Sequence, residues 1–115
     1  GRTTAESAML DIANGKVVRV VALAREYGPD HPRLTDYIAG LNEDEQASLV
    51  ACVWIGRDSF DASEVEEALR TARDERTSPT ESYLGSMPEL ADYLEAGMEA
   101  LGLDVSDEED DLSRY

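Results

Sequence analysis

The stretch that decides the fold is Leu41–Arg76, which reads LNEDEQASLVACVWIGRDSFDASEVEEALRTARDER. It contains two helix-start signatures, in each of which a short polar residue is followed three positions later by a glutamate. In the first signature, Asn42 can accept a hydrogen bond from a free N–H group of the first helical turn, and Glu45 can accept one from the Asn42 N–H. This capping box predicts a helix over Glu43–Ile55, which Gly56 is expected to end.

The second signature runs from Asp61 to Glu64 and has the same reciprocal geometry. Phe60 and Val65 stand beside it at the positions of a hydrophobic staple, which fixes the angle at which the chain enters a helix. A second helix is therefore predicted over Ala62–Glu75. Each cap stabilises its helix by about 1 kcal/mol, so the pair favours a helix–turn–helix corner.

Further helices are predicted on both sides of this corner, because apolar residues recur there at three- and four-residue spacing. Four valines in the first of these segments favour a strand by propensity. However, the run VVRVV does not alternate, and the length of the segment favours a helix. The predicted segments are Asn14–Tyr27, Arg33–Ala39, a short helix from Pro79 to Gly85, and Pro88–Leu101.

The fold class predicted from these segments is all-α, a compact bundle of five or six short helices. A chain of 115 residues is near the common size of one domain and can bury a sufficient core without disulfides or metals. We expect a flexible lead-in over residues 1–12, a single helical domain over 13–103, and a disordered acidic tail over 104–115.

The charge balance is extreme, with 26 acidic and 10 basic side chains and a net charge of −16. No basic patch is available to release phosphate counterions, so direct binding to DNA or RNA backbones is not expected. No segment approaches the roughly 20 apolar residues that span a bilayer, so membrane insertion is not expected either. Basic protein partners remain compatible with this charge.

The residues that could carry chemistry do not form a catalytic or metal-binding pattern. Cys52 lies in an apolar run and is interpreted as a small buried hydrophobe, and its solitary occurrence favours a cytoplasmic location. The one histidine, His31, sits in a proline-flanked turn. A calcium-binding loop ending at Glu64 would place Val53, Ile55 and an arginine at ligand positions, which excludes it. No catalytic residue, metal ligand or cofactor is predicted.

The aromatic residues allow two interpretations. They can fill the core with their polar tips at the surface, or some of them can line a groove for a partner, since Trp and Tyr are the usual anchors of interfaces. A glycine inside the last predicted helix indicates close approach of another helix, which could be that of a partner. The candidate partner surface, called here the Trp54 surface, consists of Trp54, Gly56, Arg57, Phe60, Tyr83, Tyr93 and Gly97.

Three stretches resemble an uncharacterised bacterial family, domain of unknown function 3775: YIAGLNEDEQASLVACVWIGR, FDASEVEEALRTARDE and SYLGSMPELADYLEAGMEALG. They begin at Tyr37 and cover about two-thirds of the chain, with a weaker likeness over Lys16–Tyr27. The resemblance implies an all-helical domain. It implies no activity, cofactor or catalytic residue.

The function expected from these observations is a non-enzymatic protein-interaction module, a small acidic accessory subunit or adaptor that docks on a larger, locally basic partner. One alternative is a regulator that mimics nucleic acid and occupies the basic groove of a DNA- or RNA-binding protein. Another is an uncharacterised enzyme or metal-dependent binder. Self-association of the domain also stays open.

Overall fold

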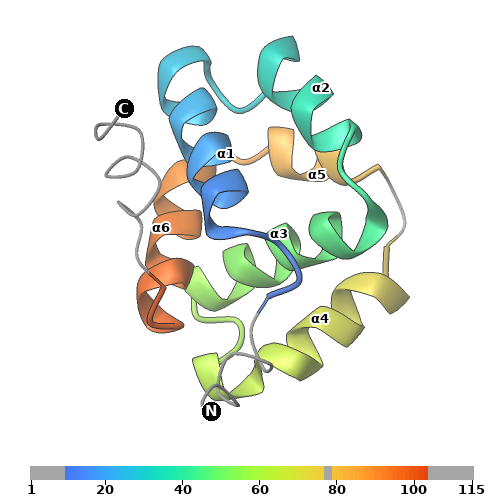
Figure 1. Cartoon of the computed structure of the whole chain (residues 1–115), viewed down its shortest axis with the longest axis vertical. Coiled ribbons are helices and arrows are strands. Elements are labelled where there is room, and N and C mark those ends of the chain that lie inside the picture. Colours follow the sequence, from blue (N-terminus) through green and yellow to red (C-terminus); the bar gives the residue numbers. More distant parts are fainter. Residues whose placement is uncertain (1–9, 77–78, 104–115) are drawn as a thin grey trace.

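The computed structural model describes residues 10–76 and 79–103, and within them the chain forms helices and no strands. This confirms the predicted all-α class. Residues 1–9 of the predicted lead-in and the acidic tail lie outside the described residues. The predicted lead-in over residues 1–12 was too long, because Ile12 is buried in the main core and Asp11 bonds to Ser48 and Arg73. Figure 1 shows the elements in order: α1 (Asn14–Tyr27), α2 (Pro32–Ala39), α3 (Glu43–Gly56), a 3-10 turn (Ala62–Glu64), α4 (Val65–Asp74), α5 (Thr80–Gly85) and α6 (Leu90–Ala100).

Helix α3 lies at the centre of the molecule and packs against α4, α5 and α6, whereas α1 packs on α6 and α2 (Figure 1). Its apolar residues point to more than one side. Leu49 and Val53 belong to the main core, and Ala51 and Ile55 belong to a second cluster with residues of α4. A helix that is apolar on several sides must be buried, which is why this segment occupies the middle of the bundle.

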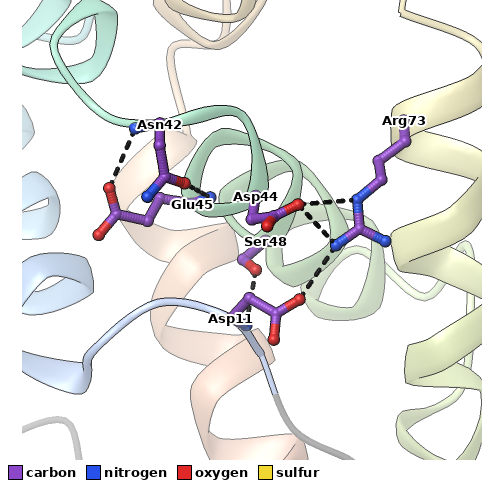
Figure 2. A network of polar contacts seen from close by, with 6 residues as sticks. All are labelled: Asp11, Asn42, Asp44, Glu45, Ser48 and Arg73. Carbon is purple, nitrogen blue, oxygen red and sulfur yellow. Dashed lines mark hydrogen bonds and ion pairs between the residues drawn. The ribbon is translucent and has the colours of Figure 1, made fainter.

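The first capping box is confirmed. The Glu45 N–H donates to Asn42 Oδ1 at 2.7 Å, and the Asn42 N–H donates to Glu45 Oε1 at 3.1 Å (Figure 2). The Lys16 ammonium of α1 also pairs with the Glu45 carboxylate. The cap therefore fixes the start of α3 and ties it to α1.

The second signature forms a tighter turn than predicted. The Asp61 N–H donates to Glu64 Oε1 at 2.8 Å, while the Glu64 N–H donates to the Asp61 carbonyl oxygen at 2.8 Å. That second bond spans three residues, so the segment begins as a 3-10 turn and the α-helix starts only at Val65. The predicted helix over 62–75 was too long at its start for this reason.

The predicted helix over Glu43–Ile55 is one residue too short, because Gly56 is the last residue inside α3 and does not follow it. The chain leaves the helix two residues later at Asp58, which has a left-handed φ of 70°. The Ser59 N–H donates to the Trp54 carbonyl oxygen at 2.8 Å, and the Asp58 N–H donates to that of Ile55 at 3.1 Å. These two bonds form a Schellman motif with an aspartate where glycine is usual.

The true role of Gly56 is to let α3 and α6 cross closely. A Cβ atom on Gly56 would lie 1.9 Å from the Tyr93 carbonyl oxygen, and a Cβ atom on Gly97 would lie 2.2 Å from that of Cys52. Each helix thus places a glycine against the backbone of the other. The expectation that the glycine inside the last helix admits a neighbouring helix is confirmed, and that neighbour is α3 of the same chain.

Candidate functional site

An open cleft of about 400 Å³ lies between α3, α4 and α5. One side is a single stripe of α3 made of Glu43, Ala47, Val50 and Trp54. These residues follow one another at spacings of four, three and four, so they share one face of the helix. The stripe begins with a charged residue, continues with apolar ones and ends in an aromatic ring.

The opposite side of the cleft comes from the end of α4, from the residues that follow it and from α5. Its floor is apolar where Ala72 faces the stripe, and its α5 wall holds a buried threonine and a half-buried tyrosine. The full set on this side is Ala72, Arg73, Glu75, Arg76, Thr80 and Tyr83.

The aromatic end of the cleft is fixed by a hydrogen bond and a stacking contact. Trp54 Nε1 donates to the Tyr83 hydroxyl oxygen at 3.0 Å. The ring of Phe60 stacks on Trp54 with centroids 5.7 Å apart and planes inclined by 27°. Trp54 is half-buried, so these contacts hold the ring while part of it lines the open cleft.

The other end of the cleft is charged and joined to a network on the same side of α3. Arg73 reaches from α4 to Asp44 of α3, with Nη2 at 3.0 Å from Oδ1, and to Asp11 of the N-terminal segment, with Nη2 at 3.0 Å from Oδ2 (Figure 2). The Asp11 N–H donates to the buried hydroxyl of Ser48 at 2.8 Å. Arg73 therefore joins three segments that are distant in the sequence.

Three further charged side chains stand at this end of the cleft. Arg76 Nη1 donates to Gln46 Oε1 at 3.4 Å, and Gln46 Nε2 donates to the Ile38 carbonyl oxygen at 2.9 Å. Glu43 and Glu75 are exposed, and no ion pair involves them within residues 10–76 and 79–103. The cleft thus combines an apolar floor, an aromatic end and a charged end.

The structure brings together only part of the predicted Trp54 surface, namely Trp54, Phe60 and Tyr83, whereas Gly56, Tyr93 and Gly97 lie at the α3–α6 crossing. Trp54 and Tyr83 form the aromatic end, and Phe60 supports Trp54. Arg57 is exposed, with its Nε donating to the Ser59 hydroxyl at 3.1 Å, and it lies outside the cleft.

Tyr93 is half-buried on α6, where a hydrogen bond with the Glu89 carboxylate raises the pKa of its hydroxyl. Gly97 is buried against Cys52, and a Cβ atom added to Gly56 would meet the Tyr93 backbone. Assigning these two glycines to a partner surface was wrong, because the α3–α6 crossing already fills the space beside them.

Sequence reasoning missed most of the residues that line the cleft. Of the ten lining residues, only Trp54 and Tyr83 belong to the predicted Trp54 surface. The signal that could have revealed the α3 residues of the cleft is that α3 has apolar residues on two sides. When one apolar side of a helix packs on the core, the other side is left for another element to cover. The arginines and Thr80 gave no such signal.

Cys52 is fully buried, and burial raises the pKa of its thiol to about 12. Its Sγ donates to the Leu94 carbonyl oxygen at 3.4 Å. The interpretation of Cys52 as a small buried residue is confirmed. Within residues 10–76 and 79–103, no group of three or more His, Cys, Asp or Glu side chains could hold a metal ion. No helix in these ranges is long and apolar enough to cross a membrane.

Comparison with known proteins gives one match. A family model described as "Protein of unknown function (DUF3775)" matches residues 31–103, a stretch that begins before α2 and includes every element of the cleft. No curated protein matches the chain, and no solved structure matches it. Because the matched residues make up more than half of the chain, the protein belongs to the DUF3775 family of proteins of unknown function.

Proposed function

We propose that this domain is a non-enzymatic protein-interaction module, a small acidic accessory subunit or adaptor that docks on a larger partner through the cleft. The observation that carries the proposal is the α3 stripe, whose apolar residues line an open cleft that ends in Trp54 and Tyr83. Concave, mostly apolar sites with a few polar groups at the rim are typical binding sites. Large aromatic side chains at such sites are frequent anchors of protein interfaces.

The geometry favours docking of side chains over enclosure of a whole helix. A helix with its side chains is about 10 Å across, which is too wide for a cleft of about 400 Å³. A partner segment that lies over the cleft can insert one or two apolar side chains between Val50, Ala72 and Trp54. The partner would then remain outside the domain, as expected for an accessory subunit.

The lone cysteine supports placing the domain in the cytoplasm.

The test is affinity capture from cells of the source organism with the full chain as bait, compared with a variant whose cleft is filled. Ala47→Phe directs a large ring into the cleft, and Ala96→Phe places the same ring on an exposed position of α6 as the control. We expect a stoichiometric protein with the wild type and the control, and its loss with Ala47→Phe. Glu43→Trp, at the exposed rim, repeats the test without changing a buried residue.

Salt separates this proposal from nucleic-acid mimicry. Contacts made mainly by apolar groups should survive moderate salt, whereas binding that depends on the charge of −16 should weaken sharply. Added DNA or RNA should compete only with a mimic. If both salt and nucleic acid release the partner, and if the Ala47→Phe variant still binds it, nucleic-acid mimicry and not docking in the cleft explains the binding. A domain that captures no stoichiometric partner would contradict both.

A further inference from the structure

We propose that the partner segment that lies over the cleft is an amphipathic helix, which inserts a large apolar side chain at the Trp54 end and places a lysine or arginine at the Glu43 end. This inference rests on the proposed function and adds the chemistry and direction of the bound segment. Two independent properties of the cleft carry it, namely the spacing of its lining residues and the balance of charge at its rim.

The lining of the cleft has a direction. Glu43 and Trp54 are eleven residues apart on the same face of α3, which separates them by about 16 Å along the helix. Between them, Ala47 and Val50 continue the stripe at helical spacing. A partner helix that lies alongside α3 presents its own side chains at the same repeat, which is the pattern of helix-in-groove recognition. A partner helix with an apolar residue at one position and a charged residue about three turns away would match the Trp54 end and the Glu43 end of the cleft.

The rim charges favour a basic residue at the second end. Arg73 already contacts two carboxylates, so its charge is compensated within the domain. Glu43 and Glu75 are exposed and have no ion pair in the part of the chain that the structure describes. The lining itself carries two acids, Glu43 and Glu75, and two bases, Arg73 and Arg76. The two carboxylates that pair with Arg73, Asp11 and Asp44, stand beside it and bring this end of the cleft to four acids and two bases. An acidic ligand would meet this excess of negative charge.

The test uses the fluorescence of Trp54, the one tryptophan of the chain, which lines the cleft. The probes are two alanine-based helical peptides of about fifteen residues that lack tryptophan. Both carry leucine and phenylalanine at one end of a face, and two lysines or two glutamates at the other end of that face. We expect the lysine peptide to bind the full chain about tenfold more tightly than the glutamate peptide. A third peptide, with its lysines on the opposite face, should bind like the glutamate peptide.

A matched pair of variants separates the rim from the overall negative charge. Glu43→Gln with Glu75→Gln removes two carboxylates at the cleft, and Glu66→Gln with Glu67→Gln removes two exposed carboxylates of α4 outside it. The first double variant should lose most of the tenfold preference, and the second should keep it. Equal loss in both variants, equal affinity for the peptides or no saturable change in fluorescence would overturn the inference.

The two proposals can fail separately. If Ala47→Phe abolishes capture of the natural partner while the peptides show no preference for lysine, the basic helix is wrong and the docking function stands. If capture is unaffected by Ala47→Phe and Glu43→Trp, the docking function itself is wrong.

Discussion

Gly97 of α6 lies so close to Cys52 of α3 that a Cβ atom on the glycine would be 2.2 Å from the Cys52 carbonyl oxygen and 2.8 Å from its Sγ. The reciprocal contact places Gly56 against the Tyr93 backbone. Two helices can approach in this way only where small residues face each other's backbone. The crossing therefore decides which residues are tolerated on the two helices that dominate the core.

Gly97→Ala should destabilise the domain although alanine is the better helix former. Propensity alone would add about 1 kcal/mol of stability, but the new methyl group must push the two backbones apart. We expect a net loss of about 2 kcal/mol in the free energy of unfolding, measured by urea denaturation. Ala96→Gly, at an exposed position of α6, is the control and should lose about 1 kcal/mol. A more stable Gly97→Ala variant would contradict the close crossing.

Asp58→Gly should stabilise the domain. Asp58 occupies the left-handed position of the Schellman motif after α3, at a φ of 70°, where a Cβ atom is unfavourable and glycine is not. We expect a gain of about 0.5–1 kcal/mol, measured as a rise in Tm and in the denaturation midpoint. Asp58→Asn controls for the lost charge and should give a smaller gain.

The same motif after α6 offers the reverse experiment. There Gly102 has a φ of 78°, its N–H donates to the Glu99 carbonyl oxygen at 3.1 Å, and the Leu103 N–H donates to that of Met98 at 2.8 Å. Gly102→Asp should therefore lower stability by an amount similar to the gain from Asp58→Gly. If the two substitutions both raise or both lower stability, the left-handed backbone conformation does not explain their effects.

Glu45 should make stability depend on pH on the acid side. The hydrogen bond from Lys16, and then that from the Asn42 N–H, lowers the pKa of the Glu45 carboxyl below its ordinary value of 4.5. A carboxyl whose pKa is lower in the folded state stabilises the fold above the unfolded pKa, and this contribution is lost as the pH falls through the folded pKa. Unfolding curves from pH 7 to pH 3 should show that Glu45→Gln flattens the decline.

Glu66→Gln serves as the control for this experiment, because Glu66 is exposed on α4 and makes no ion pair with any residue the structure describes. Its pH curve should follow that of the wild type apart from a constant offset. If both variants flatten the decline equally, general charge repulsion and not the α3 cap governs the acid side.

Cys52 should resist alkylation in the native state. Its side chain is fully buried and the pKa of its thiol is raised to about 12, so both access and thiolate formation are suppressed. Incubation with iodoacetamide at pH 8, followed by mass spectrometry, should show labelling only as fast as the domain opens. Gly97→Ala should accelerate the labelling, since it loosens the crossing that covers Cys52. Rapid labelling of the native wild type would contradict the burial.

The sequence was sufficient to predict the helices, because caps and apolar spacing are local signals. Asn42 and Glu45 set the start of α3 by contacts within one turn. Gly56 was misread because glycine commonly follows a helix, whereas its role here depends on Tyr93, which is 37 positions away. The cleft was missed for the same reason: its walls come from three helices, and no local pattern indicates where α4 and α5 leave a stripe of α3 uncovered.

The central position of α3 has a consequence for the mobility of the cleft. Because α3 contributes to both apolar clusters, it cannot detach without exposing most of the core, and its amide protons should exchange with solvent only through global unfolding. The six-residue α5 packs mainly on α2 and α3, and the end of α4 is exposed. Their amides should exchange faster, so the cleft has one rigid wall and two that can yield when a ligand enters.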